Sequence, residues 1–160
     1  IFQGTPLLLQ LFLIFFGAPV IGMDINPWIA AGIALILNSG AFLGEIWRGC
    51  IQAIPRGQWE AAEALSLSYT SRMRDVVLPQ AMKIAVAPTV GYMVQIIKGT
   101  SLAAIIGFTE ITRAGQIINN ATFQPLLVFS VVASLYFVIC WPLSLLASRL
   151  ERRQARALAR

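Results

Sequence analysis

The stretch PLLVFSVVASLYFVICWPLSLLAS, residues 125–148, contains no charged side chain. It is longer than the ~20 apolar residues that a helix needs to cross the hydrocarbon core of a membrane. The rest of the chain continues this pattern, because 58% of its 160 residues are hydrophobic and 12% are charged. Soluble domains carry about 25% charged residues. The composition therefore favours a multi-spanning membrane protein over an unusually apolar soluble helical domain.

Three more apolar runs precede this one, so the sequence predicts about four spans, over residues 5–22, 28–47, 79–97 and 125–148. The predicted fold is all-α, a polytopic transmembrane helical bundle that forms a single domain over residues 1–160. Pro88 and Gly91 favour a kink in the third span. We expect Gly99 to interrupt the helix after that span. The mixed connection 98–124 contains an apolar piece that is too short to span alone.

Charge orients the bundle, because basic residues stay on the cytoplasmic side of a membrane. The tail, residues 149–160, carries five arginines against Glu151, so we expect it to be cytoplasmic. The polar block 48–83 is separated from the tail by two spans and is expected on the same side. The same counting places Asp24 outside and Ile1 inside.

The polar block contains a segment, residues 59–73, without Pro or Gly. Helical periodicity predicts one helix there, with an apolar side and a polar side. The apolar side would consist of Ala61, Ala62, Leu65, Tyr69 and Met73. Such a helix could lie on the inner leaflet, but membrane-surface helices favour basic residues and this one begins with Glu60 and Glu63. A docking surface for a cytoplasmic protein fits better, although the apolar side could instead pack on this protein's own spans.

Residues 60–81, EAAEALSLSYTSRMRDVVLPQA, resemble the EAA loop of the membrane subunits of bacterial ABC importers. The family pattern is Glu-Ala-Ala, three residues, Gly, nine residues, Ile, one residue, Leu-Pro. Glu60, Ala61 and Ala62 match the start, and Val76 stands for Ile before Leu78 and Pro79. Ser66 departs from the pattern, since the family has Gly there. Because Gly permits a turn between two short helices, we expect a less sharp bend at Ser66.

The resemblance covers nearly the whole chain and points to the polar-amino-acid branch of these permeases. The blocks that carry it are GTPLLLQLFLIFFG (4–17), NSGAFLGEIWRGCIQAIPRGQWEAA (38–62), IKGTSLAAIIG (97–107) and PLSLLASRLERR (142–153). It implies the type I ABC importer permease fold, which has five spans and an external N-terminus. We therefore expect a fifth span before Ile1. It also implies a location in the bacterial inner membrane.

The resemblance further implies that residues 56–79 form a coupling helix that docks in a cleft of a cytoplasmic ATPase dimer. Glu60 would pair with a basic group of the ATPase, although compensation of the helix dipole is an alternative role for it. Leu65 and Tyr69 would fill the cleft beside Ala61, Ala62 and Ser66. The other implied partners are a second permease, identical or paralogous, an external solute-binding protein and a polar amino acid. The chain has no Gly-x-x-x-x-Gly-Lys-Ser/Thr loop, so we expect no enzyme activity and no cofactor here. ATP and Mg would bind to the ATPase.

Polar residues at membrane depth tend to face a cavity. The candidates for a substrate pathway are Asn38, Ser39, Glu45, Thr100 and Ser101. Each has a structural alternative: Asn38 and Ser39 could join packed helices, and Glu45 could pair with Arg48. No catalytic or metal-binding residue is predicted. Two other functions stay open, an ion-gradient-driven amino-acid carrier and a docking subunit that does not transport, but intramembrane charge relays and repeated halves, which mark such carriers, are missing from the sequence.

Overall fold

The computed structural model describes residues 2–158, and side chains are described up to residue 154. Every regular element in that range is helical, which confirms the predicted all-α class. The elements are α1 (Leu7–Gly17), η1 (Ala18–Ile21), α2 (Pro27–Gln52), α3 (Arg56–Ala64), α4 (Tyr69–Ser71), η2 (Arg72–Val77), α5 (Leu78–Thr100), η3 (Ser101–Ile106), α6 (Ile111–Thr122) and α7 (Pro125–Leu158). η1 and η3 are 3₁₀ helices, whereas η2 is a π-helix.

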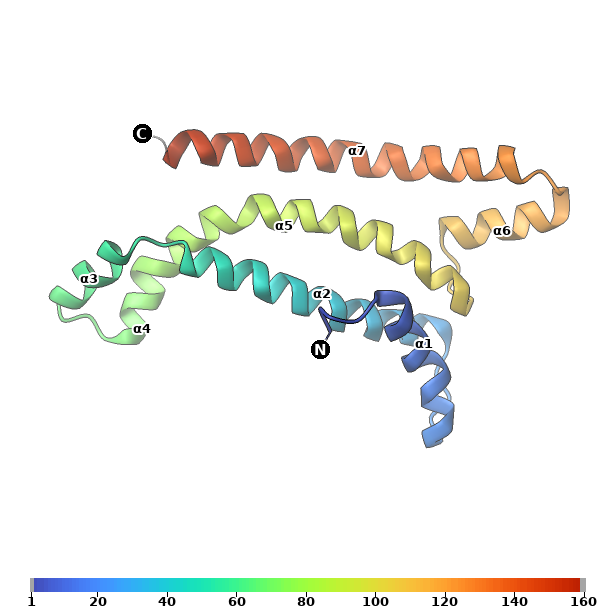
Figure 1. The fold of residues 1–160 in the computed structure, drawn as a ribbon, viewed down its shortest axis with the longest axis horizontal. Helices are drawn as coiled ribbons and strands as arrows, with labels where there is room; N and C mark the ends of the chain where they lie inside the picture. The colour runs from blue at the N-terminus through green and yellow to red at the C-terminus, as the bar shows by residue number, and fades with distance from the viewer. Residues whose placement is uncertain (1, 159–160) are drawn as a thin grey trace.

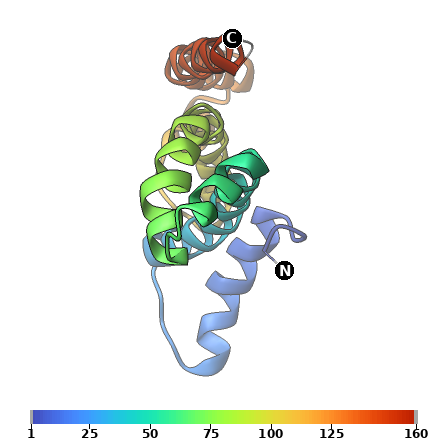
Figure 2. The same ribbon diagram turned by 90° about the vertical axis from the view of Figure 1, so that its left-hand side faces the viewer.

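The three long helices α2, α5 and α7 lie side by side along the long axis of the molecule (Figure 1). Seen from one end, α7, α5, α2 and α1 form a single file (Figure 2). α5 occupies the middle of this file and packs against both α2 and α7. An open file of this kind leaves wide apolar surfaces on both sides, which suits a protein surrounded by lipid or by other membrane subunits.

Three of the four predicted spans are helices that are long and apolar enough to cross a membrane, counted over the described residues. Their bounds are Pro27–Gln52, Tyr69–Ile106 and Pro125–Gln154. The first predicted span, residues 5–22, forms only a shorter apolar helix, Leu7–Ile21, which stands across the long helices (Figure 1). It tightens into 3₁₀ geometry at Ala18 and ends at Gly22, whose φ is +78°. Pro19 and Gly22 therefore limit this helix to less than the predicted span.

The two ends of the bundle differ in content. α3, α4 and the end of α7 lie at one end, whereas α6 and the start of α2 lie at the other (Figure 1). This agrees with the predicted sharing of one side by the polar block and the basic tail, and with the opposite position of Asp24, just before α2. Ile1 and the tail side chains from residue 155 onward lie outside the described residues.

The predicted interruption at Gly99 is wrong. α5 continues through Pro88 and Gly99 to Thr100 and is bowed along its length (Figure 1). Gly99 instead permits close packing, because a Cβ there would lie 3.1 Å from Cδ2 of Leu7. The chain turns only after η3, at Gly107, whose φ of +89° is the left-handed region that favours glycine.

Small side chains bring α1, α2 and η3 together. The core there consists of Leu11, Ala30, Ala31, Ala34, Ala103 and Ile106. Alanines let helix backbones approach closely, which is how helices associate in membranes, where lipid is as apolar as leucine. The core thus fixes α1 against the end of the bundle opposite α3.

Candidate functional site

The segment with the EAA pattern is anchored at the end of α2. Ile54, Val77 and Ala81 form a buried cluster, and Trp59 and Met73 pack against it. The cluster joins the end of α2, the first turn of α3 and the beginning of α5. Trp59 and Met73 therefore face the interior of this chain, so that α3 rests on the two neighbouring spans.

The predicted continuous helix over residues 59–73 is wrong, because α3 ends at Ala64. Ser66 adopts the left-handed conformation with φ +56°. Its N–H donates to the Glu63 carbonyl at 2.8 Å, and the Leu67 N–H donates to the Ala62 carbonyl at 3.2 Å. These two bonds form a Schellman motif, which terminates a helix. Ser66 thus makes the turn that glycine favours, and the expected loosening of the bend is not seen.

A second helix begins directly after this turn. Ser68 caps it by accepting a hydrogen bond from the Ser71 N–H at 3.3 Å, the usual role of serine at a helix start. The π-helical turn Arg72–Val77 follows and leads without a break into α5. Pro79 lacks the N–H that a regular α-helix would use, and a widened turn before it accommodates the missing bond.

The apolar side predicted for this segment is divided between two surfaces. Ala62 is 2% exposed, whereas Leu65 is 75% and Tyr69 is 67% exposed. Glu60 and Ala61 are exposed as well. Within the described residues Glu60 forms no ion pair. The alternative in which Leu65 and Tyr69 pack on this protein's own spans is therefore contradicted, and both residues are free to contact another protein.

Polar contacts connect the two arms of the turn, which are α3 on one side and the helical segment that runs from Tyr69 into α5 on the other. Arg72 Nη1 lies 3.1 Å from Glu63 Oε2, and the two side chains are 20% and 70% exposed. Gln80 Nε2 lies 3.3 Å from Gln58 Oε1 and also donates to the Val76 carbonyl at 2.8 Å. Neither contact was predicted, because no local pattern connects residues on two helices that turn back on each other.

The proposed pathway residue Asn38 is buried and joins two helices. Its Nδ2 donates to Gln10 Oε1 at 3.3 Å. Gln10, also buried, donates from Nε2 to Thr5 Oγ1 at 2.8 Å and to the Phe2 carbonyl at 2.8 Å. Sequence reasoning missed Gln10, although an amide within the apolar run 5–22 was a visible signal. The predicted alternative for Asn38, a bond between packed helices, is confirmed.

Ser39 and Glu45 lie on other faces of α2. Ser39 is partly buried. Glu45 is exposed and forms an ion pair with Arg48, whose Nε lies 2.8 Å from Glu45 Oε2. The predicted pairing three residues apart is therefore confirmed. The ion pair engages the Glu45 carboxylate, which nevertheless stays exposed on the surface of the bundle.

Thr100 and Ser101 turn their hydroxyl groups back to their own helix. Thr100 Oγ1 donates to the Ile97 carbonyl at 2.7 Å, and Ser101 Oγ donates to the Lys98 carbonyl at 2.6 Å. Such bonds satisfy the hydroxyl groups where α5 passes into η3. The structure therefore does not bring the five pathway candidates together at one point.

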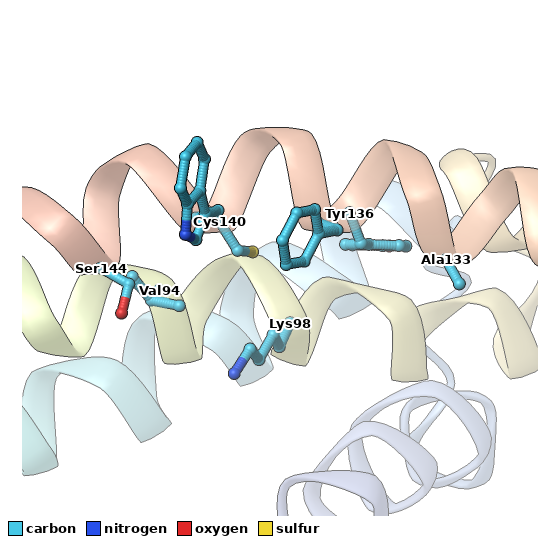
Figure 3. Close-up of a pocket in the computed structure, with 8 residues that line it drawn as sticks. Val94, Lys98, Ala133, Tyr136, Cys140 and Ser144 are labelled. Carbon is cyan, nitrogen blue, oxygen red and sulfur yellow. The ribbon is translucent and has the colours of Figure 1, made fainter.

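A cavity of about 360 Å³ lies between α5 and α7. Figure 3 shows Lys98 of α5 below Tyr136 and Cys140 of α7, with Val94 and Ser144 farther along the two helices. The lining of this cavity is mostly apolar, and the Lys98 ammonium brings a positive charge to it. An ammonium group at membrane depth is costly unless it has a partner or access to water.

A polar cluster that shares Tyr136 with this cavity was missed. Both carboxylate oxygens of Glu110 cap α6, accepting from the Thr112 and Arg113 N–H groups at 2.8 Å each. The Tyr136 hydroxyl donates to Glu110 Oε2 at 2.5 Å. Glu110 therefore joins α6 to the middle of α7. An acidic residue before a helix suggests a cap, but the sequence gives no indication of the partner Tyr136.

The chain is similar to known proteins over nearly its full length. A profile of the family described as "Binding-protein-dependent transport system inner membrane component" matches residues 1–156. The L-cystine transport system permease protein TcyB of Bacillus subtilis is 38% identical over 159 residues, which cover 99% of this chain and 68% of that protein. The glutamine transport system permease protein GlnP of Escherichia coli K12 is 39% identical over 155 residues, covering 96% of this chain and 71% of that protein.

A solved structure shares the fold. It is described as "Crystal structure of an amino acid ABC transporter with histidines" and matches with a TM-score of 0.89 and 38% sequence identity. The match covers 95% of this chain and 71% of that one. The single file of helices and the turned segment between α2 and α5 therefore occur within a fold already observed experimentally.

Proposed function

We propose a transport mechanism for this chain, which belongs to the family of binding-protein-dependent transport system inner membrane components and is a permease subunit of an amino-acid ABC importer. The finer proposal is that the turned segment between α2 and α5 is the coupling element. It docks on a cytoplasmic ATPase that binds and hydrolyses ATP with Mg. An external binding protein delivers a polar amino acid to the opposite side, and a second permease, identical or paralogous, completes the pathway.

The observation that carries this proposal is the exposure of Leu65 and Tyr69 at the corner of the turn. Both are large, and both are exposed. Leu65 follows the last residue of α3 and Tyr69 begins α4, and these two helices lie at one end of the bundle (Figure 1). Apolar and aromatic side chains that are exposed together are typical of protein contacts. Ala61 lies on the exposed face of α3, and its small side chain leaves that face flat. Ser66 forms the turn between α3 and α4. Ala62 supports the contact from below, since it is buried.

Glu60 adds charge to this surface. It is the fifth residue of α3, beyond the first turn, which contains no acidic residue, and the effect of the helix dipole falls off within that turn. Compensation of the dipole therefore does not account for Glu60. We propose that a basic group of the ATPase pairs with Glu60, because a carboxylate next to a buried apolar contact gives specificity and orientation.

Movement of the docked segment reaches the membrane by a short path. Helical structure continues from Tyr69 to Ile106, so the arm that begins at the turn also forms the central helix of the file. A displacement of the turn therefore acts on the helix that touches both α2 and α7. We propose that this helix transmits the closure of the ATPase dimer to the transport pathway.

Substrate contacts remain part of the proposal. An amino acid has a carboxylate and an ammonium group, so its pathway requires donors and acceptors. Glu45 and Ser39 are the proposed contacts of α2, with Asn38 as a support between helices. Thr100 and Ser101 are proposed contacts of α5, because each hydroxyl oxygen can still accept a hydrogen bond while it donates to the backbone.

The test is reconstitution of the permease with its ATPase and binding protein in liposomes. Glu60→Ala should reduce hydrolysis that depends on loaded binding protein, and Leu65→Ala should weaken binding of the ATPase. Asp24→Asn, at the end of the bundle opposite α3, is the matched control and should behave as the native protein does. The coupling role is wrong if the ATPase assembles with both coupling variants as with native protein and hydrolysis is unchanged. In that case the search would turn to an ion gradient or to a docking role without transport.

A further inference from the structure

Glu63 and Arg72 occupy positions that helix electrostatics disfavours. Glu63 lies in the last turn of α3, next to its final residue Ala64. Arg72 lies only four residues after Ser68, the cap at which the next helix begins. Acidic side chains are favourable near helix starts and basic ones near helix ends. Both charges are therefore at the wrong end of their helix, and their local structure does not account for them.

The two charges face each other across the turn at Ser66. Arg72 Nη1 lies 3.1 Å from Glu63 Oε2. The Arg72 side chain is 20% exposed, and its Nε is buried without a hydrogen-bond partner in the described part of the chain. An arginine held this deeply is positioned by packing, so it loses less side-chain entropy in forming the pair than a fully exposed arginine would.

The turn between α3 and α4 is restrained by two backbone hydrogen bonds and by the burial of Ala62. Three residues, Leu65 to Leu67, connect the last residue of α3 to the cap of α4. The cluster around Ile54 holds the start of α3, and the Gln58–Gln80 bond lies near that start. The far end of α3, which carries Leu65, is held across the turn by the Glu63–Arg72 pair.

We propose that the Glu63–Arg72 ion pair is a strut that fixes the angle between α3 and the helix leading into α5. The pair sets how much of the docked segment's displacement reaches the membrane. Glu63 and Arg72 are thus positioning residues, which act through Leu65 and Tyr69 rather than by contact with ATP or substrate. The inference rests on the proposed coupling function of this segment.

The first experiment measures the angle itself. Spin labels are placed at two exposed sites, Ala64→Cys on α3 and Met82→Cys on α5, after Cys50 and Cys140 are replaced by alanine. The full-length permease is studied in nanodiscs with its ATPase. With Glu63 and Arg72 intact, the distance between the two spin labels should have a narrow distribution, whereas Glu63→Gln and Arg72→Gln should each broaden it. The exchanged pair, Glu63→Arg with Arg72→Glu, should restore the narrow distribution.

The second experiment measures coupling in liposomes as amino acid transported per ATP hydrolysed. A solvent-exposed ion pair stabilises the conformation that contains it by up to about 1 kcal/mol, which corresponds to about a fivefold change in an equilibrium. The ratio should therefore fall by about two- to fivefold in each single variant, while ATPase assembly and hydrolysis continue. The exchanged pair should recover the native ratio. Arg74→Gln and Asp75→Asn, exposed neighbours without an ion pair in the described residues, are the matched controls.

The outcomes separate the inference from the proposed function. Unchanged distance distributions in both single variants would overturn the strut, as would a fall in transport and hydrolysis in equal proportion. A defect that persists in the exchanged pair would also overturn it. Failure of the native protein to bind an ATPase would instead refute the proposed coupling function, and the distance measurement on the permease alone would still decide whether the pair fixes the angle.

Discussion

Replacing Gly115 with alanine should separate α6 from α7. A Cβ at this position would lie 2.6 Å from Cγ2 of Val132 and 3.6 Å from Cγ1 of Val128. The first distance is far inside van der Waals contact, and the obstructing atom belongs to a β-branched side chain with restricted rotation. Either α6 moves away or Val132 adopts an unfavourable rotamer. Both changes disturb the short hydrogen bond that connects Glu110 to α7.

The size of the effect follows from two opposing terms. Overpacking of this kind costs ~1–3 kcal/mol. Alanine in place of glycine within a helix gains ~0.8–1.0 kcal/mol from helix propensity alone. Gly44 of α2 provides the matched control, because a Cβ there meets no atom within 4 Å. The difference in stability between Gly115→Ala and Gly44→Ala therefore isolates the contact with Val132, at about 2 kcal/mol.

The assay is thermal unfolding of the permease in nanodiscs. For a chain of this size each kcal/mol shifts Tm by about 2–4 °C, so Gly115→Ala should unfold about 4–8 °C below Gly44→Ala. Adding Val132→Ala removes the nearest atom and should recover most of the loss. A contact between the new Cβ and Val132 is refuted if the two glycine variants unfold at the same temperature, or if Val132→Ala makes the Gly115 variant still less stable.

Two further predictions concern the bends and bonds of the structure. Asn38→Leu and Gln10→Leu should each destabilise the permease by about 1–2 kcal/mol, since each leaves a buried partner unsatisfied. In a double-mutant cycle measured by thermal unfolding, the double variant should lose less stability than the sum of the two single variants, and additive effects would contradict the pairing. Ser66→Val should weaken the turn by about 1–2 kcal/mol, because a β-branched residue is disfavoured at positive φ, and Ser66→Gly should not; faster hydrogen exchange of the Leu67 amide in the valine variant alone checks this, and equal exchange in the two variants would contradict it.

The spans were predictable because their signal is carried by each segment alone. A helix surrounded by lipid must be apolar on all sides, so residues 28–47, 79–97 and 125–148 are visible without knowledge of their neighbours. The length of the first helix was not predictable in the same way. Its sequence is apolar throughout, and the limit comes from local backbone geometry at Ala18 and Gly22. Gly99 shows the opposite error, since a helix that is supported by packing tolerates a glycine that would otherwise favour a break.

The apolar stripe predicted over residues 59–73 does not persist in the structure, and the reason is physical. A stripe of apolar residues at helical spacing has meaning only while the helix continues, and one residue in the left-handed conformation rotates everything after it. Ser66 makes that change. Ala62 and Met73 then face the interior, while Leu65 and Tyr69 face outward. The stripe that the sequence placed on one side is divided between support and exposed surface.

That division also explains why the segment suits its proposed role better than a single amphipathic helix would. A continuous helix with one apolar stripe has to choose between packing on its own spans and offering that stripe to a partner. The turn at Ser66 permits both, because Trp59, Ala62 and Met73 anchor the segment while Leu65 and Tyr69 stay exposed. Anchoring alone would leave the tip of α3 free to bend at the turn. An ion pair between Glu63 and Arg72, formed at the expense of helix-dipole stability at both residues, is the restraint that such a tip requires.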